Sequence, residues 1–333
     1  MRPSFQCRMI NGPFDDPGLL VNLTFRKQAL LFDLGDLSAL APNDLLKVQR
    51  IFITHTHVDH FIGFDRILRL LLGRGKRLHL YGPHGFLANV AGKLAGYTWN
   101  LVQNYDEALV IAATEIDADR RTTRVFDCST GFIPSEAQVA AACGDVVHQE
   151  PALQVRYATL DHQIPCLAYR LQERFHVNIL KAELDALGLA VGPWIATFKA
   201  LLFEGADPAT EVSVPLTKQS PRTFALGALS EKIARITRGQ KIAYVTDAVF
   251  SRSNEEKIVA LAQDADLLFI EASFLDSERT IAEAKYHLTA RQAGLIARKA
   301  RVQQMSIFHH SPRYTGMAHV LEAEARSAFL RGI

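Results

Sequence analysis

The sequence has little cysteine, no excess of charge of one sign and no long apolar run. Its four cysteines form no C-x-x-C pair, so we expect free thiols in a reducing compartment rather than a disulfide framework. The 37 Lys and Arg residues face 35 Asp and Glu residues, which leaves a net charge of +2. A basic surface for nucleic acid would therefore have to be local.

No apolar segment approaches the roughly 18 residues that a membrane helix needs. The first residues also lack the apolar stretch of a signal peptide. We therefore expect a cytoplasmic protein that makes no membrane contact. The apolar fraction of 48% over 333 residues is enough for a large core in one or two domains.

The order of the expected elements indicates the fold class. The first half is rich in short strands, such as residues 19–25 and 28–34, and the second half alternates strands and helices. We expect one helix to begin at Asn254 or Ser253 and another at Thr289, because these side chains cap helix N-termini. This order predicts sheets packed face to face and covered by helices.

Four metal-binding side chains are crowded directly after an apolar strand at residues 50–54. They are His55, His57, Asp59 and His60. Side chains two apart in an extended segment share a face, so His55 and His57 can aim at one point and the other two at a second. Imidazole and carboxylate suit zinc, iron or manganese. The spacing favours two metal ions that share further ligands from elsewhere in the chain.

Further ligands are expected at the ends of other strands. His162 lies between two predicted strands, Asp247 ends the strand KIAYVTD, and His309 and His310 end the strand QQMSIFHH. A carboxylate has two oxygens, so Asp247 could bridge two metal ions.

These motifs resemble the metallo-β-lactamase fold superfamily and, within it, the ribonuclease Z family. The similar segments occur in the same order between about residue 30 and residue 314, and they are THTHVDH, LDHQIPCLAYR, IAYVTDA, DADLLFIEASF, YHLTARQAG and FHHSPRY. The resemblance implies an α+β fold, a four-layer αββα sandwich of one domain spanning residues 1–333. It also implies a small inserted arm, which we place at residues 173–222, where two short helices interrupt the strand pattern.

The resemblance implies a ligand assignment around two metal ions. One ion takes His55, His57 and His162, the other takes Asp59, His60 and His309, and Asp247 bridges them. We expect two zinc ions, with manganese and iron as alternatives, and room for a bridging water or hydroxide. Asp59 and His287 are the expected catalytic residues, the latter as general acid. Glu271 is a candidate to orient His287, and Asp33 is a candidate to hold the cluster from outside.

The resemblance implies a metal-dependent phosphodiesterase that uses the metal-bridging hydroxide. Its expected substrate is RNA, as a ribonuclease Z-type endonuclease acting on the 3′ ends of tRNA precursors, and its expected state is a homodimer. However, residues 173–218 carry four basic and six acidic side chains, a poor surface for phosphates. A hydrolase of the same fold acting on a small phosphodiester, sulfate ester or other ester therefore stays open.

Two alternatives belong to other classes. A non-catalytic nucleic-acid-binding or scaffold protein would usually lose ligands, and this set is complete. A di-iron oxygen reductase commonly has glutamate where His57 stands. Two local basic patches, residues 73–77 with Arg66 and Arg69, and residues 119–124, could meet phosphates, although such patches are more often solvated surface.

Overall fold

The computed structural model describes residues 3–24, 26–142, 144–216 and 221–331. The chain forms two compact units. The larger unit consists of Phe5–Val147, Arg156–Arg170 and Ile242–Ile333, and the smaller unit of Met1–Ser4, His148–Val155 and Leu171–Lys241. Residues 173–222 fall in the smaller unit; that they are an arm inserted into one domain stays a prediction.

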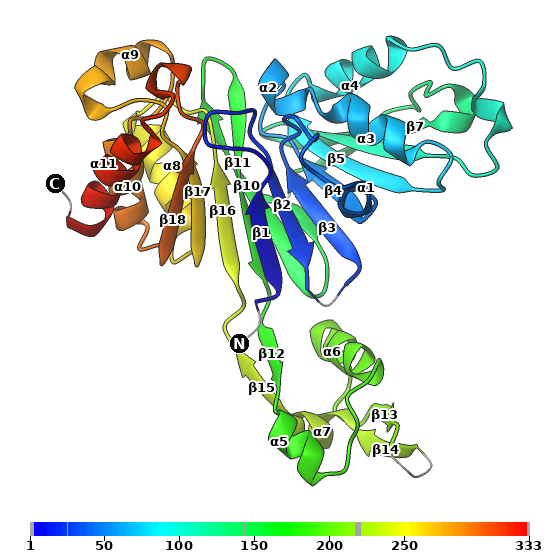
Figure 1. Ribbon diagram of the computed structural model, residues 1–333. Coiled ribbons are helices and arrows are strands. Elements are labelled where there is room, and N and C mark those ends of the chain that lie inside the picture. Colours follow the sequence, from blue (N-terminus) through cyan, green and yellow to red (C-terminus); the bar gives the residue numbers. More distant parts are fainter. Residues whose placement is uncertain (1–2, 25, 143, 217–220, 332–333) are drawn as a thin grey trace. The chain divides into compact units, whose positions relative to one another are not determined.

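An eight-stranded sheet begins the larger unit (Figure 1). Strands β3 to β6 run parallel, and the pairs at both edges are antiparallel. The parallel strands end at the same edge of the sheet, which brings the loops after them together. In spatial order the strands are β1 (Phe5–Met9), β2 (Leu19–Leu23), β3 (Gln28–Phe32), β4 (Val48–Phe52), β5 (Arg77–Pro83), β6 (Val110–Ile116), β7 (Arg120–Asp127) and β8 (Gln138–Ala141).

A six-stranded sheet faces the first one. Its strands β16, β17 and β18 are parallel, and β16 and β17 are mostly apolar and buried, as expected for strands covered on both faces. In spatial order the strands are β18 (Gln304–Phe308), β17 (Leu267–Glu271), β16 (Lys241–Val245), β11 (Pro165–Glu173), β10 (Leu153–Asp161) and β9 (Val146–Gln149).

Helices cover the outer face of each sheet (Figure 1). The apolar sides of α3 and α4 pack on the eight-stranded sheet, and those of α8, α10 and α11 belong to the core of the other sheet. The helices of the larger unit are α1 (Pro42–Leu45), α2 (Val58–Phe61), α3 (Phe64–Leu71), α4 (Phe86–Ala95), α8 (Arg252–Ala262), α9 (Arg279–Ala284), α10 (Ala290–Lys299) and α11 (Ala318–Arg331).

Aromatic rings join the two sheets. The ring of Phe32 on β3 lies 5.2 Å from Phe52 on β4, and 5.8 and 5.9 Å from Tyr169 on β11 and Tyr244 on β16, measured between centroids. All four side chains are fully buried. Helix, sheet, sheet and helix therefore form four layers, and the predicted αββα sandwich is confirmed.

The helix starts show where local chemistry decides the structure. Helix α10 begins at Thr289 as predicted, in a capping box in which the side chains of Thr289 and Gln292 each bond the other's backbone N–H. The prediction for α8 is wrong, because its N-cap is Ser251, whose hydroxyl accepts from the backbone N–H of Asn254. Asn254 lies inside the helix and is buried, and its side-chain amide bonds the backbone of Asp161.

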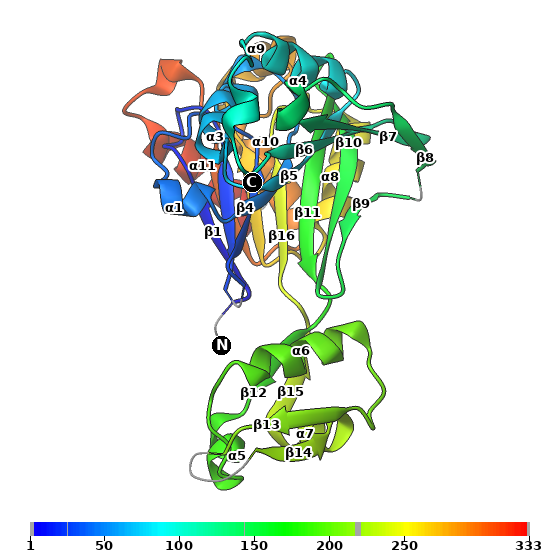
Figure 2. The same ribbon diagram turned by 90° about the vertical axis from the view of Figure 1, so that its right-hand side faces the viewer.

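The smaller unit has a core of its own (Figure 2). The two predicted helices are α5 (Lys181–Ala186) and α6 (Trp194–Glu204), and α7 (Leu226–Ile233) packs with them. Two small antiparallel sheets complete the unit, β12 (His176–Ile179) with β15 (Ala234–Thr237) and β13 (Glu211–Val214) with β14 (Arg222–Ala225).

Two sequence expectations concern the whole chain. Cys7, Cys128 and Cys166 are free thiols, and Cys143 lies outside the described residues. In the described part of the chain, no helix combines the length and the apolar character that crossing a membrane requires.

Candidate metal centre

The candidate ligands lie at the ends of strands from both sheets. The loop after β4 carries His55, and His57 is the N-cap residue of the short helix α2, which follows with Asp59 and His60. In the other sheet, β16 and β18 are parallel, so Asp247 and His309 directly beyond them lie at one edge. His162 occupies the turn between β10 and β11.

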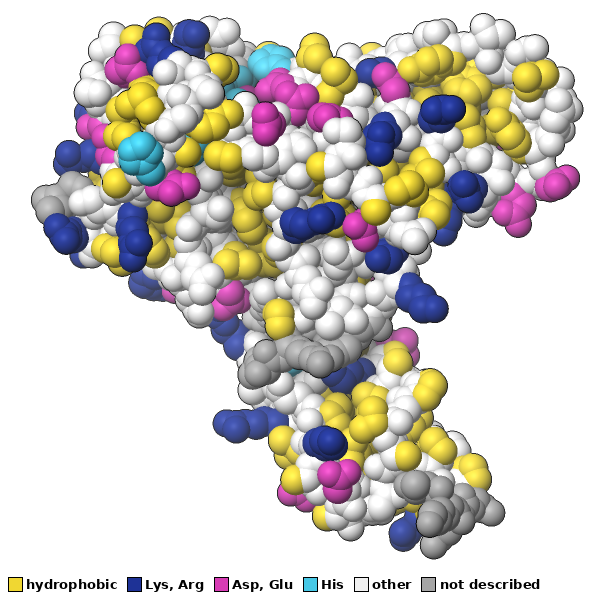
Figure 3. All heavy atoms as spheres, viewed as in Figure 1, with side chains coloured by type: hydrophobic (Ala, Val, Ile, Leu, Met, Phe, Trp, Pro, Cys, Tyr) yellow, Lys and Arg dark blue, Asp and Glu magenta, His cyan; other side chains and the backbone are white. Residues whose placement is uncertain are grey.

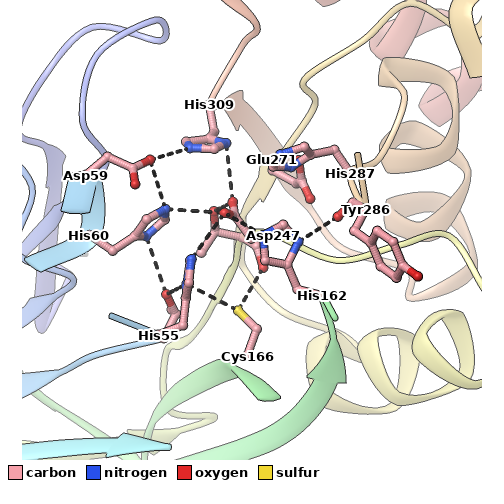
Figure 4. Close-up of polar contacts among 12 residues, drawn as sticks. His55, Asp59, His60, His162, Cys166, Asp247, Glu271, Tyr286, His287 and His309 are labelled. Atoms are coloured by element: carbon pink, nitrogen blue, oxygen red, sulfur yellow. Dashed lines mark hydrogen bonds and ion pairs between the residues drawn. The ribbon is translucent and has the colours of Figure 1, made fainter. Parts of the chain in front are cut away.

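Asp247 is the centre of the cluster (Figure 4). Its Oδ2 atom lies 3.4 Å from Nε2 of His55, 3.4 Å from Nε2 of His60 and 3.5 Å from Nε2 of His162. Its Oδ1 atom lies 3.2 Å from Nδ1 of His309. One carboxylate thus faces four imidazoles with its two oxygens.

The ligand atoms lie in neighbouring groups, and one of these joins Asp247 and His309 with Glu271 and His287. His55, His57, His162 and Asp247 each offer an atom within 4.8 Å of the others, and so do Asp59, His60 and His309. In the second group, Oδ2 of Asp59 lies 3.2 Å from Nε2 of His309 and 3.4 Å from Nε2 of His60. The structure therefore brings together all seven side chains that the sequence predicts as ligands, in the two predicted groups.

Unpartnered nitrogen atoms show that these groups fit metal ions. Nε2 of His55, Nε2 of His60 and Nδ1 of His309 are buried and have no hydrogen-bond partner. Leaving such atoms unpaired costs about 1–3 kcal/mol each. All three lie close to the Asp247 carboxylate, and nitrogen with carboxylate oxygen is the donor set of zinc and related ions.

The Nδ1 atoms of His60, His162 and His55 contact other groups of the protein. Nδ1 of His60 donates to Oδ2 of Asp33 at 2.9 Å, and Nδ1 of His162 donates to the carbonyl oxygen of Tyr286 at 2.8 Å. Nδ1 of His55 lies 3.1 Å from the hydroxyl of Thr54. These contacts place the hydrogen on Nδ1 and leave Nε2 with a lone pair for a metal ion.

Burial lowers the pKa values of the clustered histidines, and the neighbouring carboxylates raise them. Burial lowers the pKa of His55 to about 2, so this ring is neutral, the form that binds metal. Burial also lowers the pKa of His60, but the carboxylates of Asp247 and Asp33 outweigh it and raise the pKa well above its ordinary value. The pocket at His60 therefore demands a positive charge, which either a proton or a metal ion can supply.

His287 and Glu271 form a pair at the rim of the cluster. Nδ1 of His287 lies 2.9 Å from Oε2 of Glu271, and the other carboxylate oxygen accepts from the backbone N–H of Ala248 at 2.7 Å. Burial lowers the pKa of His287, but the Glu271 carboxylate raises it to about 9. The ring centroid lies 5.1 Å from His162 and 5.5 Å from His309, so His287 borders both metal groups.

A cavity of about 320 Å³ opens beside the cluster. Asp59, His287 and His309 line it together with residues of the loop after β1, including Phe14. His310 also lines it, but its Nδ1 donates to the carbonyl oxygen of Ala272 at 2.8 Å and its ring meets Phe14 edge-on. Of the histidine doublet, His309 faces the cluster, as predicted.

Some residues that support the site were not predicted from the sequence. Tyr244 donates to Asp33 at 3.1 Å, and the thiol of Cys166 lies 3.7 Å from Nδ1 of His55. The Asn254 amide bonds the backbone N–H and carbonyl of Asp161, which fixes the turn before His162. Tyr244 and Cys166 stand within apolar segments, and Asn254 stands within a polar one, so no common sequence signal marks them.

Known proteins resemble this chain in sequence and in fold. No family model matches it. A ribonuclease Z of Deinococcus radiodurans is 30% identical over 293 residues, which cover 86% of this chain and 83% of that protein. A ribonuclease Z of Lactiplantibacillus plantarum is 29% identical over 315 residues, 91% of this chain and 84% of that protein.

Solved structures agree with this relationship at the level of the fold. The metallo-β-lactamase fold protein YhfI of Bacillus subtilis matches 98% of this chain and 93% of its own, with a TM-score of 0.56 and 15% identity. The short form of human tRNase Z matches 94% of this chain and 93% of its own, with a TM-score of 0.50 and 16% identity. The chain has the metallo-β-lactamase fold, and its sequence shows that it belongs to the ribonuclease Z family.

Proposed function

We propose that this protein is a metal-dependent endoribonuclease that cleaves tRNA precursors at their 3′ ends. The observation that carries the proposal is the cluster of seven candidate ligands in which four imidazoles face Asp247, with His287 at the rim of the same cluster. The family relationship supports RNA as the substrate. The similar proteins are named ribonuclease Z, so they do not support the alternative of a hydrolase that acts on small esters.

The residues that would hold the metal ions are those of the two groups. His55, His57 and His162 would hold one ion, Asp59, His60 and His309 the other, and Asp247 both. We propose zinc, which suits three imidazoles and a carboxylate, although manganese and iron accept the same donors. Two such ions supply positive charge for the phosphoryl oxygens and make water a nucleophile at neutral pH.

The chain's own residues would orient the water and move the proton. The Asp59 carboxylate is 40% exposed at the side chain and can accept a hydrogen bond from the attacking water. The water oxygen bonds to phosphorus as the bond from phosphorus to the tRNA 3′ oxygen breaks. His287, held at Nδ1 by Glu271, would donate its Nε2 proton to that leaving oxygen, which gives a 3′-hydroxyl on the tRNA and a 5′-phosphate on the trailer.

Three finer proposals accompany this function. The protein acts in the cytoplasm. It acts as a homodimer, an expectation that rests on family resemblance. Its resident ions are zinc, which metal analysis of the purified protein would identify.

Cleavage of a 3′-extended tRNA transcript tests the main proposal. The purified protein should cut it next to the discriminator base, and chelation of metal should abolish the cut. Bis(p-nitrophenyl) phosphate, cyclic nucleotides and aryl sulfates serve as competing substrates in parallel. Turnover of any of these with no cleavage of the tRNA precursor would overturn the proposal.

A further inference from the structure

A basic groove lies on the larger unit, outside the metal centre. It has a volume of about 590 Å³ and lies between α1 and α3. Three arginines line it, Arg66 and Arg69 on α3 and Arg74 just after it. Figure 3 shows Lys and Arg side chains on the face that α3 and α1 form.

The charges of this groove are not neutralised by its own carboxylates. Asp65 lines the groove, but its carboxylate accepts from the ammonium group of Lys93 at 2.9 Å. Asp44 on α1 pairs with Arg8 and Lys47. Among the described residues, no salt bridge joins any of the three groove arginines to a carboxylate, although the charge of Asp36 acts on Arg66 at longer range.

The position of Arg74 is fixed by the backbone. Its Nε donates to the carbonyl oxygen of Leu70 at 2.8 Å, which leaves the two outer nitrogens of the guanidinium free for a ligand. Arginine presents a planar fork of donors that matches two phosphate oxygens. Leu45, Leu70 and Leu72 form the apolar floor.

A line of exposed side chains leads from the groove arginines back along the chain to α2, the helix that carries Asp59 and His60. Val58, Ile62, Arg66 and Arg69 follow each other at spacings of four, four and three residues, so they share one face of the nearly continuous helices α2 and α3. Val58 and Ile62 are 74% and 46% exposed, unusual for such residues, and they flank Asp59 and His60. The line spans roughly 16 Å at 1.5 Å per residue, the length of a few nucleotides.

Residues 173–218 form a poorer phosphate-binding surface than the groove. They carry four basic and six acidic side chains, although the smaller unit also includes the basic residues of segment 222–241. The 710 Å³ cavity described in this unit combines Arg174 with Glu150 and Glu204, so a phosphate there would meet carboxylates.

We propose that Arg66, Arg69 and Arg74 bind backbone phosphates of the RNA substrate, whose bases pass over Val58 and Ile62 on the way to the metal centre. The proposal rests on the proposed function, because it assigns a second contact to the same substrate. Aliphatic side chains can pack against the faces of bases, while phosphate contacts set position. The groove is thus a positioning surface, separate from the catalytic residues.

Salt dependence of RNA binding tests the groove. We would measure binding of labelled mature tRNA, which is not a cleavage substrate, from 50 to 200 mM salt. Each lost phosphate contact lowers the slope of log affinity against log salt by about 0.7–0.9, so the triple variant R66A/R69A/R74A should lose about 2.1–2.7 units of slope. Over this fourfold change of salt, wild-type binding should therefore weaken about 20- to 40-fold more than binding by the variant.

Two further variants make the test specific. R66K/R69K/R74K keeps the charges and should retain most of the slope. The variant R252A/K299A/R301A removes three exposed cations that pair with Glu256 and Glu255 on α8 and with Asp264 just after it; it changes the net charge equally and should leave the slope unaltered. Thermal unfolding would show that each variant is folded.

Three results would overturn the proposal. The slope and affinity of the triple alanine variant could equal those of wild type. The control variant could lose as much slope as the groove variant. The groove variant could instead change the sedimentation coefficient with no change in RNA binding, which would show that a second copy of the chain covers this face. If the wild-type protein cleaves the tRNA precursor but the groove variant binds tRNA as wild type does, the phosphate-binding role of the groove is rejected and the proposed function is kept. If tRNA binding depends on the groove arginines but no cleavage occurs, the proposed function is rejected and the binding role is kept.

Discussion

The substitution Asp33→Asn tests how the metal centre is held from behind. Asp33 is fully buried and its carboxylate accepts four hydrogen bonds, from the backbone N–H and hydroxyl of Thr54, from Nδ1 of His60 and from the hydroxyl of Tyr244. Its backbone has a φ of +58°, which Asn tolerates as Asp does. Asparagine therefore changes the charge and one acceptor, and little else.

The expected loss of stability follows from the four contacts. The amide oxygen can replace Oδ2 and keep three of the donors, but bonds to a neutral acceptor are weaker than bonds to a carboxylate by about 1 kcal/mol each. The amide nitrogen then faces the backbone N–H of Thr54, which is left unpaired at a cost of about 1–3 kcal/mol. The sum of about 4–6 kcal/mol is a large part of the 5–15 kcal/mol that stabilises a typical domain.

Two measurements check this prediction. Urea unfolding of the metal-free protein should show the loss of stability, and chelator competition should show metal affinity reduced about 10- to 100-fold, the usual effect of removing a group that orients a ligand. Tyr244→Phe removes one of the four donors and is the matched control, with a loss near 1 kcal/mol. Metal affinity and stability in Asp33→Asn equal to those of wild type would refute the argument.

Further predictions concern the reaction and the scaffold. His287→Ala should keep its metal content and slow turnover of the tRNA precursor about 10²-fold or more, the scale of general acid catalysis; undiminished kcat would show that the role is misassigned. Asp247→Ala should instead lose metal, which elemental analysis of the purified variant would detect. Thr289→Ala removes the capping box of α10 and should lower the stability by about 1 kcal/mol, seen as a lower Tm. Gly63→Ala would place its Cβ 2.2 Å from the carbonyl oxygen of Gly35, so this variant should unfold at markedly lower temperature, and an unchanged Tm would contradict the packing.

The parts of the structure that were predictable share one physical origin. Apolar strands alternating with helices are visible in the sequence, and in such a sheet polar residues directly beyond a strand come to its edge. This is why His162, Asp247 and the pair His309 and His310 could be chosen from their positions. The family resemblance then selected His309, and the structure places His162, Asp247 and His309 around the His55–His60 loop.

The unpredicted parts depend on contacts between distant segments. Cys166 on β11 approaches His55 from 111 residues away, and Tyr244 reaches Asp33 from 211 residues away. No local period encodes such pairs. The predicted N-cap of α8 is wrong for a related reason. Asn254 is a good cap by propensity, but its amide bonds the backbone of Asp161, and Ser251 caps the helix instead.

The backbone at the ends of the strands adds a constraint that composition could not reveal. Asp33, Asp247 and His309 have φ angles of +58°, +45° and +59°, and Gln163 and Tyr286 beside His162 and His287 are also positive. A left-handed residue other than glycine costs roughly 1–2 kcal/mol, less for Asp. Five of the eight such residues in the described chain thus adjoin one site, because an abrupt turn after a strand is what points the next side chain inward. Glycine would relieve the strain but would bring no ligand, so at the three site positions the ligand or its holder occupies a conformation that few other non-glycine residues of the described chain adopt.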